Sequence, residues 1–366
     1  MSNIRPDGSF NPEHNIKYLP DSYANEYSQF LLDEGNLVIA MTDMAGDPKI
    51  LGVPTLVKNR KGRNFLLNQR VGKLTDFSPE IYIPFLRYYL SSPAIKEYYK
   101  SKGAGGLQLN ISKKDVLNAE IPITNFSEQK RIVAKLDQCF ESIDKARVNV
   151  EKNLQNAKDL FQSQLNEIFS QKGDGWVEKK LSEVFIFRQG IQRDVKLQTE
   201  VKRGSQVRFL RIVDYTQGNE PPRYIDNPGK EYMMSDDDIA LVRYGASTGF
   251  VCNGYEGALA NNLFRVIPKD EYDISLKYLY YFLKSPSFQG VIHKAMNGAA
   301  MPAISFGLIN DIPFPLTQRA EQDELASIIE DVELKCLKVI TNYQQELDAL
   351  DELKKSILEK AFNGEL

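Results

Sequence analysis

Two long stretches of the chain repeat apolar residues with the period of a helix. Between 126 and 172 the apolar positions follow steps of four and three, with one extra step of four after Val150. The same pattern returns between 319 and 366, with the extra step after Tyr343. The predicted apolar seams are Ile132, Leu136, Cys139, Ile143, Ala146, Val150, Leu154, Ala157, Phe161 and Ile168, and Leu325, Ile329, Val332, Cys336, Val339, Tyr343, Leu347, Leu350, Ile357 and Ala361.

A seam this narrow predicts one partner helix for each long helix. Each stretch of about 45 residues would form a helix of ~65 Å, for which Ser127 is the predicted N-cap in the first copy. We therefore expect the two helices to pair as an antiparallel coiled coil. In the alternative, each helix packs only on its own globular domain, but helices of this length would overshoot such a domain.

The segments before each long helix combine short apolar strands with aromatic-rich helices, which predicts an α+β fold with two α/β domains. A Ser-Pro pair interrupts each aromatic-rich helix and indicates a kink or a restart. The expected strands are 36–41, 65–67, 238–243 and 263–267, and the expected helices are 83–99 and 276–292.

The chain contains an internal duplication. With a shift of 193 positions, residues 83–168 align with 276–361 without a gap. Asn110-Ile111-Ser112 then falls on Ala303-Ile304-Ser305. A repeat this long indicates a duplicated domain plus helix rather than a solenoid. The two copies predict pseudo-two-fold symmetry and four parts, namely 1–125, 126–172, 173–318 and 319–366.

Charge is unevenly distributed along the chain. The net charge is −3 over 366 residues, but residues 58–114 carry 12 lysines and arginines against three acidic residues. Such a basic segment is typical of nucleic-acid binding. Residues 173–318 have no net charge, and residues 319–366 carry −6.

Composition also limits the class of protein. No run approaches the ~18 apolar residues of a membrane span, and the three cysteines form no Cys-x-x-Cys pair. We expect a cytoplasmic protein with no membrane contact. With two histidines and no phosphate-binding loop, Gly-x-Ser-x-Gly or His-Glu-x-x-His motif, we expect no catalytic residues, no metal and no cofactor of its own.

One string of residues resembles a known family. Ile121-Pro122, followed by Glu128 to Asp137 and by Phe140 and Ile143-Asp144, closely resembles the central conserved region of type I restriction-modification specificity (S) subunits. The C-terminal segment Ile357–Leu366 is similar to that family's usual end, and Trp176, Leu181 and Val184 resemble the usual entry to a target recognition domain.

The resemblance implies a non-catalytic DNA-recognition subunit. Two target recognition domains, 1–125 and 173–318, would each read half of a bipartite site in double-stranded DNA. The helices 126–172 and 319–366 would set the spacing between the halves and dock two copies of the methyltransferase subunit, to which a restriction/translocase subunit adds. S-adenosylmethionine is then expected on the methyltransferase and not on this chain.

The first domain departs from the family pattern near its start. Arg5 and its neighbours resemble Arg211–Asp214, so the counterpart of Trp176 to about Val207 is missing. We expect that either the start was lost or misassigned, or a second polypeptide supplies this part. The alternative function is therefore a truncated S-like interaction protein that binds the methyltransferase without productive DNA recognition.

The candidate DNA-binding residues combine phosphate-binding cations with side chains that can read base edges. In the second domain, some candidates form a polar run after an expected strand at 181–187. Other candidates lie on the glycine-flanked loop 243–249. Gly245 and Gly249 in this loop fit either a close approach to DNA or turn geometry. The candidates are Lys58, Asn59, Arg60, Lys61, Arg63, Asn64, Gln69, Arg70, Lys100, Lys102, Lys113 and Lys114 in the first domain, and Arg188, Gln189, Gln192, Arg193, Lys196, Arg243, Tyr244 and Thr248 in the second.

Overall fold

The computed structural model describes residues 1–58, 63–171, 173, 175–296 and 303–366. The chain divides into two compact units, each of which contains part of both long helices. Unit 1 consists of Met1–Lys152 and Gln344–Leu366, and unit 2 consists of Asn153–Tyr343.

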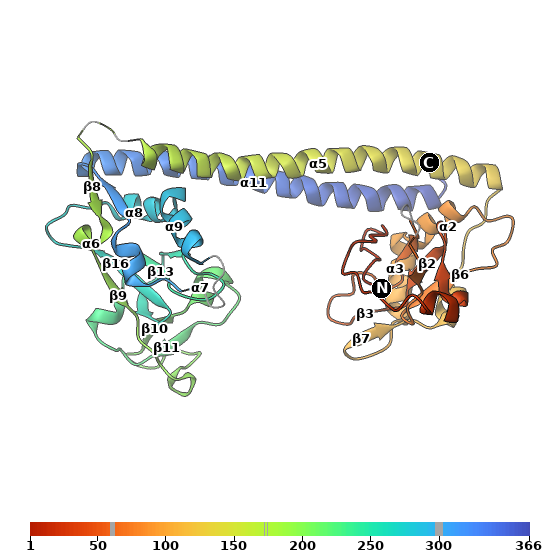
Figure 1. Cartoon of the computed structure of the whole chain (residues 1–366), viewed down its shortest axis with the longest axis horizontal. Helices are drawn as coiled ribbons and strands as arrows, with labels where there is room; N and C mark the ends of the chain where they lie inside the picture. The colour runs from red at the N-terminus through yellow and green to blue at the C-terminus, as the bar shows by residue number, and fades with distance from the viewer. Residues whose placement is uncertain (59–62, 172, 174, 297–302) are drawn as a thin grey trace. The chain divides into compact units, whose positions relative to one another are not determined.

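The two long helices form as predicted. Helix α5 spans Phe126–Ser170 and helix α11 spans Arg319–Phe362 (Figure 1). The predicted cap of α5 is wrong by two residues, because the Asn125 side-chain oxygen accepts the Glu128 N–H at 2.8 Å. Asparagine is as good a cap as serine, and it satisfies an N–H group that the first helical turn leaves free.

The seam of the helices is largely as expected. Leu136 is fully buried, and Ile143 and Val150 are 5% exposed. Val339, placed in the seam, is 41% exposed, whereas Leu165, outside the predicted seam, is fully buried. At these two positions the buried face therefore follows the adjacent globular domain rather than a continuous heptad pattern.

The pairing of the helices is antiparallel, as predicted. In unit 1, Lys354 of α11 pairs with Asp144 of α5, and Asp351 pairs with Arg147, so the residue numbers run in opposite directions. In unit 2, Leu165 of α5 and Ile329 of α11 lie in one hydrophobic core. Apolar burial of these seams is the main stabilising contribution, because exposed ion pairs add little.

The core of unit 1 is a three-stranded antiparallel sheet in the order β4-β2-β6. On the central strand, Val38 lies opposite Thr55 and Lys73. The sheet strands are β2 Leu37–Ala40, β4 Pro54–Leu56 and β6 Val71–Leu74; the other elements are α1 Tyr23–Glu26, η1 Ser28–Phe30, β1 Leu31–Leu32, β3 Thr42–Met44, β5 Phe65–Leu66, α2 Ile83–Leu90, α3 Pro93–Lys102, β7 Gln108–Asn110 and α4 Lys113–Leu117.

Unit 2 contains two four-stranded sheets, β14-β13-β16-β9 and β11-β10-β15-β12, and the pair β17-β8. Its strands are β8 Val177–Lys180, β9 Phe185–Gln189, β10 Val207–Leu210, β11 Arg223–Ile225, β12 Met233–Met234, β13 Ala240–Val242, β14 Val251–Cys252, β15 Gly257–Leu259, β16 Leu263–Pro268 and β17 Pro313–Leu316. Its shorter helices are α6 Leu181–Val184, η2 Val195–Leu197, α7 Ile212–Thr216, η3 Lys230–Tyr232, α8 Leu276–Lys284, α9 Pro286–Met296 and α10 Phe306–Asn310.

The duplication is visible in the pairing of the strands. Strands β13, β14 and β16 pair with one another as β2, β4 and β6 do. The expected strand at 65–67 is therefore not the counterpart of the strand at 263–267, because β5 pairs with β1 outside the sheet. The true counterpart, β6, contains Gly72 and Lys73 and is less apolar than β5.

Two further predictions have clear outcomes. The Ser-Pro breaks divide each aromatic-rich helix in two, with Pro93 and Pro286 starting α3 and α9, where proline is tolerated. The expected strand at 181–187 is wrong in its first half. Residues 181–184 form the helix α6, and β9 begins only at Phe185.

Candidate nucleic-acid interface

In unit 2, Arg243 follows the inner strand β13, and its backbone forms hydrogen bonds on both sides. The N–H of Arg243 donates to the Asn262 carbonyl at 2.8 Å, and the carbonyl of Arg243 accepts from the Ile304 N–H at 2.7 Å. These bonds join the end of β13 to the turn before β16 and to the segment before α10. The backbone of Arg243 is thus fixed at the point where β13 ends.

A chain of hydrogen bonds connects this arginine to three residues with carboxamide side chains. Arg243 Nη1 donates to Gln189 Oε1 at 2.6 Å, and Gln189 Nε2 donates to the Asn261 carbonyl at 2.8 Å. Asn261 Nδ2 lies 3.4 Å from Gln192 Oε1. We call Gln189, Gln192, Arg243 and Asn261 the amide–guanidinium cluster. These groups are the ones that read guanine and adenine edges in the major groove.

Sequence reasoning found three members of the cluster and missed one. Gln189, Gln192 and Arg243 were candidates, and the structure brings them together. Asn261 was missed, although the pair Asn261-Asn262 between two apolar strands was a usable signal for an exposed polar turn.

Unit 1 repeats the backbone arrangement with different side chains. The Met41 N–H donates to the Arg70 carbonyl at 2.9 Å, and the Met41 carbonyl accepts from the Ile111 N–H at 3.0 Å. Arg70 therefore occupies the place of Asn262, and Gln69 that of Asn261. These two candidates therefore lie at the position that corresponds to the cluster in unit 2, and both side chains are exposed.

The other candidates of unit 1 are spread over several elements. Asn59, Arg60 and Lys61 lie outside the described residues. Lys58 and Asn64 are exposed, whereas Arg63 pairs with Glu13 at 2.9 Å. Lys100 and Lys102 end α3, Lys113 and Lys114 begin α4, and all four are exposed.

Two cations of the basic segment 58–114 are engaged within the domain. Lys73 Nζ lies 3.4 Å from the Leu31 carbonyl, and the Arg87 guanidinium lies 4.6 Å from the centre of the Tyr88 ring. The cations available for phosphate contacts are therefore fewer than the net charge of this segment indicates.

In unit 2 the remaining candidates differ in accessibility. Arg188 and Lys196 are exposed, and Arg193 and Tyr244 are half-buried. Thr248 is only 6% exposed and its hydroxyl donates to the Gly245 carbonyl at 2.6 Å. This position corrects its assignment as a DNA contact, because the side chain stabilises a turn.

Glycine at position 249 is explained by its backbone conformation and its packing. Its φ is +89°, and a Cβ there would meet Gln289 Oε1 at 3.0 Å and Ile292 Cγ2 at 3.2 Å. Gly245 has φ +103° with open space around its Cα, so its turn conformation alone requires glycine.

Only the first part of a basic run in unit 2, with Arg188, Arg193 and Lys196, was chosen from the sequence, because charge was averaged over the whole domain. Residues 188–211 carry seven lysines and arginines against two acidic residues. Val195, Leu197 and Val201 lie in the same run and are 61–74% exposed. Exposed apolar side chains between cations are a surface that can contact a nucleic acid.

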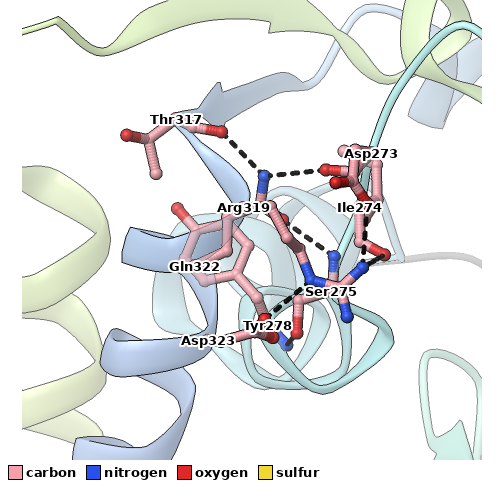
Figure 2. Close-up of polar contacts among 8 residues, drawn as sticks. All are labelled: Asp273, Ile274, Ser275, Tyr278, Thr317, Arg319, Gln322 and Asp323. Atoms are coloured by element: carbon pink, nitrogen blue, oxygen red, sulfur yellow. Dashed lines mark hydrogen bonds and ion pairs between the residues drawn. The ribbon is translucent and has the colours of Figure 1, made fainter.

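In each unit one buried glutamine joins a long helix to the segment before the first aromatic-rich helix, a connection that we call the joint. In unit 2, Gln322 Oε1 accepts the Ser275 N–H at 2.9 Å (Figure 2). Its Nε2 donates to the carbonyls of Thr317 at 2.8 Å and Asp273 at 3.3 Å. Gln322 is fully buried, so one side chain satisfies three backbone groups from two segments.

Unit 1 contains the same arrangement 193 residues earlier. Gln129 Oε1 accepts the Tyr82 N–H at 2.8 Å. Its Nε2 donates to the carbonyls of Glu80 and Thr124, each at 2.8 Å. Gln129 is also fully buried.

Unit 2 has a second polar connection that unit 1 lacks. Arg319 Nη1 donates to Asp273 Oδ1 at 2.9 Å and lies 3.4 Å from the Ile274 carbonyl (Figure 2). The residue at this place in the first copy is Phe126, whose ring contacts Tyr82. The joint between α11 and the segment before α8 is therefore more polar than its counterpart in unit 1.

Tyrosine–carboxylate bonds add to both joints. The Tyr88 hydroxyl donates to Asp137 Oδ1 at 2.5 Å, and Tyr281 donates to Glu333 Oε2 at 2.9 Å. Burial, together with the hydrogen bond to Asp137, raises the pKa of Tyr88 to about 12. Burial also raises the pKa of Tyr281. Both hydroxyls thus stay protonated donors at neutral pH.

The comparison with protein families matches both copies of the repeat. The model of the type I restriction modification DNA specificity domain matches residues 5–153 and 173–349. The chain belongs to this specificity family. Its two matched segments coincide with the two copies that the strand pairing and the buried glutamines define.

Relatives within the specificity family match over nearly the whole chain. The specificity subunit of the type I restriction enzyme StySPI from Salmonella potsdam is 21% identical over 98% of this chain and 86% of the relative. The EcoKI specificity subunit from Escherichia coli K12 is 22% identical over the same shares of the two chains.

Solved structures of the specificity family have the same fold. A chain from a study of complex assembly and conformational transition in a type I R-M system has a TM-score of 0.76 at 19% identity, covering 92% of this chain and 83% of its own. The HsdS subunit from Thermoanaerobacter tengcongensis has a TM-score of 0.54 at 21% identity, covering 92% and 82%.

The described residues offer neither a metal site nor a membrane span. Within them, no group of three or more His, Cys, Asp or Glu side chains is placed to hold a metal ion. In the same part of the chain, no helix combines the length and the apolar character that crossing a membrane requires.

Proposed function

We propose that this chain is the DNA sequence-recognition subunit of a type I restriction-modification complex and has no catalytic role of its own. One observation carries the proposal: the recognition sheet occurs twice, and in each copy polar side chains project from the turn beside the residue that follows the central strand. Two such groups of polar side chains would fit a bipartite DNA site, with each unit reading one half.

Base reading is assigned to the amide–guanidinium cluster in unit 2 and to Gln69 and Arg70 in unit 1. Phosphate contacts are assigned to exposed cations, because lysine and arginine supply most of the affinity for DNA without sequence preference. Those cations are Lys58, Lys100, Lys102, Lys113 and Lys114 in unit 1, and Arg188 and Lys196 in unit 2.

The long helices are proposed to set the spacing between the half-sites and to dock the partner proteins. A duplicated chain offers two equivalent faces, which supports two copies of the methyltransferase subunit. A restriction/translocase subunit completes the complex. S-adenosylmethionine belongs to the methyltransferase in this proposal, and the cell compartment is the cytoplasm.

The test is a methylome. The chain is co-expressed with its methyltransferase subunit in a host without DNA methylation, and modified adenines are mapped by single-molecule sequencing. A two-part motif with a fixed spacer is the expected result. The Arg243→Ala variant is expected to keep one half and relax the other by about tenfold or more, since a bidentate base contact contributes ~1–3 kcal/mol.

Two other outcomes would contradict parts of the proposal. A motif with one specified half would show that only one unit reads DNA. A stable complex with the methyltransferase but no modified adenine would instead favour an interaction protein without DNA recognition.

A further inference from the structure

The loop between β9 and β10 of unit 2 exposes two aliphatic side chains close together in the sequence (Figure 1). Val195 is 74% exposed and Leu197 is 61% exposed, and both belong to the short helix η2. We call these two residues the apolar tip. Covering aliphatic side chains is favourable in water, so the apolar tip is a place where a partner can gain affinity.

The start of this loop is fixed against the turn between β15 and β16. The Gly190 N–H donates to the Leu263 carbonyl at 2.9 Å, and the Ile191 N–H donates to the Leu259 carbonyl at 2.8 Å. The side chain of Ile191 packs against the core that contains Phe209. The loop therefore leaves the sheet at a defined point.

The rest of the loop is closed by its own hydrogen bonds. Gln198 Nε2 donates to the Arg193 carbonyl at 2.9 Å, on the other side of the apolar tip. After the tip, Thr199 and Tyr224 exchange two backbone hydrogen bonds, at 3.0 and 2.8 Å. A loop that is fixed at both ends loses less conformational entropy when its tip binds a partner.

The apolar tip comes shortly after the amide–guanidinium cluster in the chain. Gln192 belongs to the cluster, and its Oε1 lies 3.4 Å from Asn261 Nδ2. Three residues of chain span at most ~10 Å, which is about three base-pair steps of DNA. The backbone of Val195 therefore stays within about three base pairs of any base that Gln192 reads.

The charge around the apolar tip favours DNA as the partner. Residues 188–211 carry seven lysines and arginines against two acidic residues, and Lys196 and Lys202 are exposed. One of the two acidic residues, Glu200, is paired with Arg223 at 2.9 Å. In the major groove, where amides and guanidinium groups read base edges, the apolar group that a base presents is the C5 methyl of thymine.

We propose that the apolar tip contacts the C5 methyl group of a thymine in the half-site that unit 2 reads. The amide–guanidinium cluster reads hydrogen-bonding groups of the same half-site, and the apolar tip adds a thymine to the sequence that is specified. The inference rests on the proposed function. It adds Val195 and Leu197 to the residues that determine specificity.

The test removes one methyl group of the DNA at a time. The probe is a fluorescein-labelled duplex with the motif mapped in the methylome, and the protein is the complex of the full chain with its methyltransferase subunit. Each thymine, on either strand, in the half that responds to Arg243→Ala is replaced in turn by uracil, which lacks only the C5 methyl. One replacement is expected to weaken binding about threefold to fivefold in fluorescence anisotropy, the scale of one buried CH₂ group.

Variants of the apolar tip show whether these residues read that methyl group. With Val195→Ser and Leu197→Ser together, the thymine duplex and the uracil duplex are expected to bind equally, because the partner of the methyl group is gone. Leu197→Ala alone should reduce the difference, and it replaces the double variant if that variant does not form the complex. Val177→Ser is the control and should keep the full difference, because Val177 is 52% exposed on β8, outside the loop.

A charge variant separates base contact from phosphate contact. Lys196→Ala should weaken binding to the motif duplex and to a random-sequence duplex by similar factors, and should lower the salt dependence by about one ion. Variants of the apolar tip should weaken binding to the motif duplex alone.

Four results would overturn the inference. In the first, no uracil replacement weakens binding, and in the second, the critical replacement weakens binding equally in the wild-type chain and in the tip variants. In the third, the tip variants weaken binding to the random duplex as much as to the motif duplex. In the fourth, they leave DNA binding unchanged and weaken the complex with the methyltransferase, which would make the apolar tip a protein contact. A methylome without any motif would overturn the proposed function itself, and the inference with it.

Discussion

At the scale of single residues, the two buried glutamines are difficult to replace. Gln129 and Gln322 each satisfy three backbone groups and are fully buried. An apolar side chain of similar size would leave all three groups without partners. An unpaired buried polar group costs ~1–3 kcal/mol, so the loss exceeds that of an ordinary side-chain hydrogen bond.

We predict that Gln322→Leu lowers the free energy of unfolding by about 2–5 kcal/mol, measured by urea denaturation. Gln345→Leu is the control, because Gln345 is exposed on the same helix, and it should change stability by less than ~0.5 kcal/mol.

The two glutamines should differ in their effect on hydrogen exchange. Gln129→Leu should accelerate exchange at the joint of unit 1 more than Gln322→Leu accelerates it at the joint of unit 2, because Arg319 still connects α11 to Asp273 in unit 2. Equal acceleration would contradict a role for Arg319.

A second prediction uses the single tryptophan of the chain. The Thr317 hydroxyl, and then the Trp176 indole N–H at 2.8 Å, donate to Glu321 and lower the pKa of its carboxyl below 4.5. The ionised form stabilises the fold, so this contribution is present above the unfolded pKa and is lost as pH falls through the lower, folded pKa. Trp176 emission should therefore change with a midpoint below 4.5. Glu321→Gln should remove this transition, and an unchanged titration in that variant would refute the assignment.

At the scale of elements, the helices were predictable and the strand partners were not. The apolar period that predicts α5 and α11 depends on residues close together in the sequence. The same holds for the prolines that divide α2 from α3 and α8 from α9. Strand pairing joins distant residues, and so the choice between β5 and β6 as the partner of β2 is not encoded in either strand alone. The exposure of Val339 likewise depends on which globular surface α11 meets.

The extra step of four in each seam gives a prediction about spacing. Deleting Glu151–Leu154 and Gln344–Leu347 removes both extra steps and leaves an unbroken pattern of fours and threes. Four residues of helix correspond to ~6 Å, or about two base pairs. The methylome of this variant should show the same half-sites with a spacer shorter by about two base pairs. An unchanged spacer would refute the proposal that the helices set it.

At the scale of the whole molecule, the two units should read DNA independently. Gln69→Ala is expected to relax one half of the methylated motif, and Gln192→Ala the other, each by about tenfold or less. The double variant should relax both by the same amounts, since distant sites are additive. A change in both halves from either single variant would contradict independent reading.

The candidate site was only partly predictable from sequence. Arg243, Gln189 and Gln192 could be chosen because they follow apolar strands. Asn261 joins them only through the turn between β15 and β16, and these two strands belong to different sheets. Thr248 was chosen for its place in a glycine-flanked loop, but the direction of its hydroxyl depends on the turn geometry.

The division of the chain into units has a consequence for its synthesis. Unit 2 is continuous, from Asn153 to Tyr343, whereas unit 1 combines the first 152 residues with the last 23. On the ribosome the second recognition domain can complete its core while the first still lacks its second helix. The part of the protein that is made first is therefore the last to finish folding, which reverses the usual order for a chain with two folded units.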